Sequence, residues 1–158
     1  MNDYLRSIQM LIDDGFRKLI KHNTPINAAY TYNSDHAFIL NEDKIELNYP
    51  EIMFSVGDVE GPEAPELSSE NGLIILKWFN MPQSLYCQYS DKASVLIYEP
   101  NKKSSIIYKS AGIRSELEVA LKAHCYVNKD VHCFISFSSA DGKRQGNSIY
   151  LGMLKVLN

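Results

Sequence analysis

The sequence predicts a mainly β protein, an antiparallel β-sandwich with one amphipathic helix at its N-terminus. In the C-terminal half, side chains alternate between apolar and polar with the period of two that half-buried strands show. The chain closes in a hairpin, Val131 to Phe137 and Ser148 to Val156, around an Asp141-Gly142 turn. Helical spacing is convincing in one stretch only, residues 3–21. Short strands separated by turns favour two packed sheets.

Apolar residues in the stretch 3–21 recur at three- and four-residue steps and form one stripe along the predicted helix. They are Tyr4, Leu5, Ile8, Leu11, Ile12, Phe16, Leu19 and Ile20. Two roles are open for this stripe: it packs on the protein's own sheet, or it binds a partner or a second copy of the chain. For the second role we predict that the contact residues include Tyr4, Ile8, Leu11 and Ile12.

Pro25 is expected to end this helix, because proline disfavours helical geometry in the residue before it. Three short strands are then expected, at Ala28 to Tyr32, Lys44 to Leu47 and Ile52 to Val56. Polar turn residues separate these segments, which supports reading each of them as an element of its own.

The stretch 57–65 is acidic and rich in Gly and Pro, and it is the best linker or long loop in the chain. We therefore divide the chain there. Residues 1–61 are expected to hold the N-terminal helix and short strands, packing on the sandwich or extending it. Residues 62–158 are expected to form the β-sandwich domain.

Six strands are expected beyond this boundary, and alternation indicates which side of each is buried. They are Leu73 to Phe79, Ala93 to Tyr98, Ser105 to Lys109, Glu116 to Leu121, and the two strands of the closing hairpin. Leu117, Val119 and Leu121 are expected to point inward, and Ser110-Ala111-Gly112 to form a turn. In the strand that begins at residue 131, one face is Val131, Cys133, Ile135 and Phe137, and the other is His132, Phe134 and Ser136.

Composition excludes some partners. The net charge of −3 gives no electrostatic case for nucleic acid or an anionic membrane. No apolar run is long enough to span a membrane, and Met1-Asn2-Asp3 opens no signal peptide, so a cytoplasmic location is expected. Three cysteines, Cys87, Cys125 and Cys133, cannot all pair within one chain, and apolar neighbours favour reduced thiols in or near a core. If the protein is exported by a route that the sequence does not reveal, a Cys125–Cys133 disulfide is the alternative.

The order of features in the second half resembles a fibronectin type III or related immunoglobulin-like module. A Pro-containing segment at Pro62 and Pro65 is followed by a strand that carries the sole tryptophan, Trp78, and the chain ends in a hairpin with a polar loop, Ser138 to Asn147. The Cys-Trp-Cys pattern of antibody domains is absent. The resemblance is one of architecture, which implies no activity.

A second resemblance covers nearly the whole chain. The segments that carry it are Gly15-Phe16, Asn27-Ala28-Ala29, Tyr32-Asn33, 55–58, 92–100, Tyr108, 112–114, 131–134, 140–143 and 147–152. They are similar to an uncharacterised bacterial family of unknown function, found mainly in Bacteroidetes. The resemblance supplies no catalytic residues. Members typically begin with a Gly-rich, basic segment that this chain lacks, and such a segment is expected to be a place where a member anchors to its partner.

No residue pattern predicts a metal, a cofactor or a catalytic site. His124-Cys125 and His132-Cys133 suggest zinc at first sight, but neighbouring residues of a strand point to opposite faces and cannot readily reach one ion. Cys133 lies on the predicted core face, where a thiol is inert. The adjacent carboxylates Asp13 and Asp14 lack the separated, convergent geometry of acid–base catalysis. No phosphate-binding or nucleophile motif is present.

Binding is the remaining class of function. Tyr86, Tyr89, Tyr98, Tyr108 and Tyr126 either form a platform for carbohydrate or stabilise the sheet as cross-strand pairs. The closing loop is basic and polar, and Asp141, Lys143, Arg144 and Asn147 are its predicted partner-binding residues, since loops on a rigid scaffold carry recognition. A plain solvated loop is the other interpretation.

The sequence therefore favours a non-enzymatic structural or protein-interaction module, as a subunit of a larger assembly or by self-association. The alternative is a β-sandwich that binds carbohydrate or another small ligand. A third hypothesis, an enzyme acting through Cys87 or Cys125, lacks a supporting constellation. No cofactor, no nucleic acid and no membrane span are expected.

Overall fold

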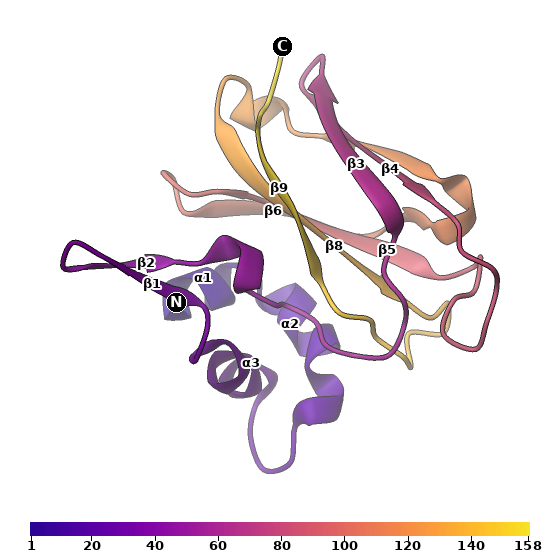
Figure 1. Ribbon diagram of the computed structural model, residues 1–158, viewed down its shortest axis with the longest axis horizontal. Coiled ribbons are helices and arrows are strands. Elements are labelled where there is room, and N and C mark those ends of the chain that lie inside the picture. The colour runs from indigo at the N-terminus through magenta and orange to yellow at the C-terminus, as the bar shows by residue number, and fades with distance from the viewer.

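Two antiparallel sheets form the C-terminal part of the molecule (Figure 1) in the computed structural model, which describes residues 1–158. One sheet has the strand order β3-β4-β7, with β3 Glu63–Glu70, β4 Leu73–Phe79 and β7 Glu118–Lys122. The other has the order β6-β5-β8-β9, with β5 Lys92–Glu99, β6 Ser104–Ile113, β8 Asp130–Ser138 and β9 Ile149–Lys155. The predicted antiparallel, mainly β sandwich is confirmed.

The space between these sheets is filled by the alternate side chains that the sequence predicts to face inward. From β4 they are Ile74, Leu76 and Trp78, and from β8 they are Val131, Cys133, Ile135 and Phe137. Val95 and Ile97 of β5 join them from the middle of the four-stranded sheet. All are buried, and complete burial of each large apolar side chain stabilises the fold by about 1.5–3 kcal/mol.

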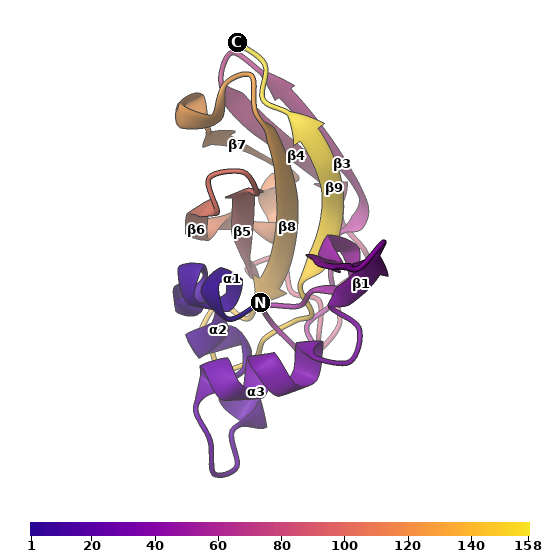
Figure 2. The same cartoon turned by 90° about the vertical axis from the view of Figure 1, so that its left-hand side faces the viewer.

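A second core lies on the opposite face of the four-stranded sheet. Leu96 and Tyr98 of β5 and Phe134 of β8 point away from the sandwich, yet they too are buried. Figure 2 shows α1 (Asn2–Ser7) and α2 (Gln9–Gly15) lying against this face of β5 and β8. The central strands of this sheet are therefore covered on both sides.

The expected single helix over residues 3–21 is broken into three pieces that keep one apolar stripe. Ile8, between α1 and α2, has φ −118° and ψ 20°, and Phe16, before the 3₁₀ turn η1 (Arg17–Leu19), has φ −107° and ψ 6°. Both residues remain fully buried, so packing against the sheet overrides the regular helix at these points. Gly15 ends α2 where a Cβ would lie 2.3 Å from the carbonyl oxygen of Phe54.

Ala28 to Tyr32 is not a strand but part of a further helix, α3 (Pro25–Asn33). Proline has no amide hydrogen and its φ is fixed near the helical value, so Pro25 starts α3. Thr24 caps α3, since its hydroxyl accepts a hydrogen bond from the amide of Asn27 at 3.4 Å. The expectation that Pro25 ends the first helix is wrong, because the preceding 3₁₀ turn already ends at Leu19.

Ile52 to Val56 is not a strand either, because its backbone groups are satisfied outside any sheet. The amide of Met53 donates to Oδ1 of the buried Asn33 at 2.8 Å, and the amide of Phe54 donates to the Ser148 hydroxyl at 2.9 Å. The amide of Val56 donates to the carbonyl of Gly15 at 3.1 Å. The segment follows the 3₁₀ turn η2 (Tyr49–Glu51) and fastens the helices to the closing loop.

Two smaller predictions are wrong. The residues Ser110-Ala111-Gly112 lie inside β6, where a register shift between Ala93 and Val95 of β5 accommodates them. Leu117 is not inward: it precedes β7 in a left-handed conformation, with φ 63°, after the 3₁₀ turn η3 (Arg114–Glu116), and its side chain is exposed. Val119 and Leu121 are buried as predicted.

A small hairpin projects from the helical side of the molecule (Figure 1). It consists of β1 (Phe38–Asn41) and β2 (Lys44–Leu47), and it pairs with neither sheet of the sandwich. Its second strand is the predicted Lys44 to Leu47. The remaining 3₁₀ turn, η4 (His124–Tyr126), connects β7 to β8. No helix in the structure combines the length and the apolarity that crossing a membrane requires.

Candidate functional site

A polar pocket lies where the helices stop covering the four-stranded sheet. Along β5 the outward side chains are Lys92 and Ser94, followed by the helix-covered Leu96, and along β8 the covered Phe134 is followed by Ser136. Ser94 pairs directly with Ser136, so the two side chains stand on the same side of the sheet. One face of these strands thus changes from apolar to polar at the edge of the helical layer.

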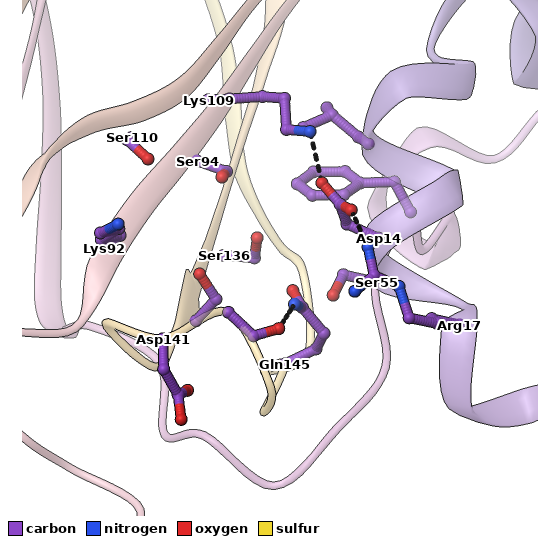
Figure 3. Close-up of a pocket in the computed structure, with 14 residues that line it drawn as sticks. Asp14, Arg17, Ser55, Lys92, Ser94, Lys109, Ser110, Ser136, Asp141 and Gln145 are labelled. Carbon is purple, nitrogen blue, oxygen red and sulfur yellow. Dashed lines mark hydrogen bonds and ion pairs between the residues drawn. The ribbon is translucent and has the colours of Figure 1, made fainter.

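Three segments form the walls of the pocket above this polar floor (Figure 3). The floor and the walls enclose a volume of about 200 Å³. Asp14 of α2 stands on one side, Phe54 and Ser55 on the next, and the closing loop from Asp141 to Gln145 on the third. The wall is held in place by the Ser55 hydroxyl, which donates to the carbonyl of Gly146 at 2.7 Å. A space of this size suits a ligand smaller than the drug-sized molecules that fill pockets of roughly 300–1,000 Å³.

The charges around the pocket are unequally paired. Asp14 forms ion pairs with Arg17, at 2.5 Å, and with Lys109 of β6. Hydrogen bonds from the Ser139 hydroxyl and the Lys143 amide hold the pKa of Asp141 below its usual value. Lys92 is the lining cation that has no carboxylate within ion-pair distance. The pocket therefore presents one unpaired positive charge.

The two His-Cys pairs do not form a site. His132 stacks on Tyr49 with 3.8 Å between ring centroids, and its Nδ1 lies 2.8 Å from the Tyr150 hydroxyl. Burial lowers the pKa of His132. Cys133 lies on the opposite face, where burial raises the pKa of its thiol to about 12. No group of three or more His, Cys, Asp or Glu side chains in the structure is arranged to hold a metal ion.

The environments of the three free cysteines predict their reactivity. Cys125 is exposed, whereas Cys87 and Cys133 are fully buried, and burial raises the pKa of both buried thiols. We expect an aromatic disulfide reagent at neutral pH to modify one thiol quickly in the native protein and all three in denaturant. A Cys125→Ser variant should lose the fast phase. A fast phase that survives this substitution would contradict the assigned burial of the other two.

The predicted partner-binding residues of the helix are not available to a partner. Tyr4, Ile8, Leu11 and Ile12 are all buried in the second core, against Leu96, Tyr98 and Phe134 of the sheet. The stripe therefore takes the first of its two open roles, packing on the protein's own sheet. The hypothesis that it is an exposed docking surface is wrong for this structure.

The predicted residues of the closing loop lie apart from one another. Asp141 borders the polar pocket, and Lys143 is exposed. Arg144 donates to the carbonyl of Leu85 at 3.2 Å and lies over the ring of Tyr86, 5.6 Å from its centroid. Asn147 accepts a hydrogen bond from the Gly57 amide at 3.0 Å. Arg144 and Asn147 thus brace the loop, while Asp141 and Lys143 remain accessible.

The five tyrosines do not form a carbohydrate platform. Tyr98 and Tyr126 are buried, and the Tyr108 hydroxyl donates to the carbonyl of Lys122 at 2.8 Å. Only Tyr86 and Tyr89 are exposed, both in the connection between β4 and β5. For the buried rings, the interpretation that they stabilise the fold is the one that applies.

One exposed apolar surface escaped the sequence predictions. Leu40 of β1 and Ile45 of β2 are directly paired across the small hairpin, and they are 75% and 72% exposed. The next pair on the same face is Phe38 with Leu47. The signal was available in the sequence, because apolar side chains occupy alternate positions on both sides of the turn Asn41 to Lys44.

Comparisons with known proteins place the chain among proteins of unknown function. The chain is similar to the crystal structure of the FN1-FN3 domains of chicken CNTN1, with 10% sequence identity and a TM-score of 0.43; the match covers 65% of this chain and 33% of that one. It thus spans about a third of that structure's length. No curated protein matches the chain significantly. Residues 1–152 match the model of the family described as "Family of unknown function (DUF6266)", and the chain therefore belongs to that family.

Proposed function

We propose that this protein is a non-enzymatic protein-interaction module that docks on its partner through the β1–β2 hairpin. The observation that carries the proposal is the pair Leu40 and Ile45, two large aliphatic side chains that are mostly exposed and face the same way. The structure leaves their apolar surface in water. Transfer of each side chain into an interface would contribute about 1.5–3 kcal/mol to binding.

The backbone of the hairpin favours a protein partner as well. β1 and β2 pair only with each other, so each strand has an outer edge of unpaired amide and carbonyl groups. A two-stranded hairpin has marginal stability alone, and an added strand supplies both hydrogen bonds and a surface for the apolar side chains. A second copy of this chain is one such partner.

A bilayer is a poorer match for the same surface. The turn at the tip of the hairpin carries Glu42 and Asp43, which an anionic lipid surface repels. The net charge of the chain, −3, acts in the same direction. We therefore favour a protein over a membrane as the occupant.

The non-enzymatic part of the proposal rests on the thiols and carboxylates. Cys87 and Cys133 are buried with raised pKa values, which disfavours the thiolate form that a nucleophile needs. Asp14 is held in place by two cations, and hydrogen bonds of its own loop hold Asp141 and keep its pKa below the usual value. Three free thiols suit the reducing bacterial cytoplasm that we infer as its location.

Site-specific photo-cross-linking tests this proposal. A photoreactive amino acid in place of Leu40 should form a discrete protein adduct, either a dimer of this chain or one defined partner. The additional substitution Ile45→Ser, on the paired position, should reduce the adduct at least about tenfold, because one buried aliphatic side chain contributes roughly 1.5–3 kcal/mol. The same probe at the exposed Lys102, in the turn between β5 and β6, is the matched control.

Three results would contradict the proposal. One is an adduct yield at position 40 no higher than at position 102. Another is a protein adduct that Ile45→Ser leaves unchanged, since docking would then not involve the apolar pair. The third is transfer of the probe to lipid alone, which would assign the hairpin to a membrane.

A further inference from the structure

We propose that the polar pocket between α2, β5, β8 and the closing loop binds a small hydroxylated anion, of the chemical class of a monosaccharide phosphate. This goes beyond the proposed interaction through the hairpin and depends on none of the hairpin residues. Figure 3 shows the side chains concerned, with Ser94, Ser136 and Lys92 on the sheet and Asp14 and Arg17 on the helical side.

Ser136 is the first observation that points to a ligand. It is only 4% exposed, it lines the pocket, and its hydroxyl makes no hydrogen bond within the protein. Buried polar side chains are nearly always hydrogen-bonded. A hydroxyl without a partner in the protein at this position therefore points to a hydrogen-bonding group of a ligand. The Ser136 hydroxyl oxygen keeps some contact with solvent, so a ligand in the pocket can reach it.

The composition of the floor is the second observation. Ser94, Ser110 and Ser138 also line the pocket, and their hydroxyls likewise make no hydrogen bond within the protein. Each hydroxyl both donates and accepts, which suits the hydroxyl groups of a polyol. The volume of about 200 Å³ limits the ligand to a few functional groups.

The charge of the pocket selects an anion. Three cationic side chains and two carboxylates line it, which leaves one net positive charge (Lys92, Lys109 and Arg17 against Asp14 and Asp141). Asp14 is already held by Arg17 and Lys109, and Lys92 remains unpaired at the floor, in register with Ser138. An ammonium beside free hydroxyls is a donor set that suits one phosphate group.

Titration of the full-length, isotope-labelled protein with three probes tests the proposal. Glucose 6-phosphate should shift the amide resonances of Ser94, Ser136 and the loop 141–145 in a saturable way. Inorganic phosphate and glucose, each carrying only half of the recognised groups, should bind at least about tenfold more weakly, since a hydrogen bond to a charged group contributes a factor of this order.

Two substitutions locate the binding. Ser136→Ala removes the free hydroxyl and adds no atom to the pocket, and Lys92→Met removes the charge while keeping most of the aliphatic stem. Each should weaken binding of glucose 6-phosphate about tenfold or more, while thermal unfolding confirms that both variants fold. Ser68→Ala in β3 and Lys122→Met in β7 are matched controls, because both residues are exposed on the other sheet.

The outcomes separate clearly. Saturable binding of glucose 6-phosphate that both pocket variants weaken and both control variants leave unchanged supports the site. No saturable shift with millimolar glucose 6-phosphate overturns it, and so does binding that Ser136→Ala and Lys92→Met leave intact. Inorganic phosphate binding as tightly as glucose 6-phosphate would overturn the assignment of a hydroxylated ligand.

Discussion

Replacement of Arg114 by methionine should destabilise the protein by about 3–5 kcal/mol, because it leaves the carboxylate of Asp91 buried without a counter-charge. Arg114 is fully buried, and its guanidinium lies 3.1 Å from Oδ2 of Asp91. Its other donors bind the carbonyls of Glu60, at 2.5 Å, and Gly61, at 3.1 Å. The Arg114 side chain thus fixes the backbone of the segment that leads into β3.

Arg114 is also packed into the sandwich core. Its guanidinium stacks over the ring of Phe137, 4.0 Å from the centroid, and its carbonyl accepts a hydrogen bond from the Trp78 indole at 2.8 Å. A methionine fills part of the volume and keeps the backbone carbonyl that accepts from Trp78, but it supplies none of the hydrogen bonds of the guanidinium. The loss therefore extends beyond one ion pair.

Urea denaturation followed by tryptophan fluorescence measures this effect. Arg114→Lys should be intermediate, because it keeps the charge and loses the planar set of donors. Arg17→Met, at an exposed ion pair, should cost less than about 1 kcal/mol. The double variant Arg114→Met/Asp91→Leu should recover part of the loss. An Arg114→Met variant no less stable than Arg17→Met would refute the assigned role.

The second large effect is expected at Phe134, whose truncation to alanine should cost about 3–5 kcal/mol. Phe134 is fully buried, although it points away from the sandwich core. Its ring packs edge-on against Phe54 at 6.5 Å and lies 5.1 Å from the ring of Tyr150. It connects the sheet to the segment that fastens the helices.

Two other phenylalanines provide matched controls for this prediction. Phe137→Ala, on the opposite face of the same strand, should cost a similar amount, because both faces of β8 are core. Phe79→Ala, on a side chain that is 62% exposed, should stay within about 0.5 kcal/mol of wild type. Chemical denaturation of the three variants decides the point. A Phe134→Ala variant as stable as Phe79→Ala would mean that the helical layer contributes no core.

Six of the seven strands of the sandwich could be predicted, because alternation carries over directly into burial. The seventh, β3 (Glu63–Glu70), was missed: it begins inside the stretch predicted to be a linker, and most of its side chains are exposed. Ile74, Leu76 and Trp78 of β4 face the core, as their spacing requires. The same logic placed His132, Phe134 and Ser136 together on the other face of β8. What covers that face could not be deduced, because the pairing of a terminal helix with a given sheet depends on contacts far apart in sequence. The helices cover Phe134, which is therefore part of the second core, and they stop short of Ser136, which therefore lies at the floor of the pocket.

Local signals failed where a residue can play either of two roles. Proline can end a helix or begin one, and Pro25 begins α3, so the β-prone residues that follow it, such as Tyr30 and Tyr32, are helical and do not form the predicted strand. Phe54 and its neighbours have the composition of a strand, but their amides donate to two side chains and to the carbonyl at the end of α2. The polar pocket was missed because Ser94 and Ser136 are far apart in sequence and meet only through strand pairing.

The central claim is that the N-terminal helices and the sandwich form one cooperative unit, which leaves the hairpin and the pocket as the surfaces for other molecules. Native-state hydrogen exchange tests this most directly, by comparing the amides of Ile12 and Phe16, both buried in the second core, with those of the central strand β8. We predict that the helix amides open with the same free energy as β8, within about 1 kcal/mol. Helix amides that exchange through a local opening several kcal/mol less costly, while β8 stays protected, would contradict the claim and make the helical stripe available to a partner.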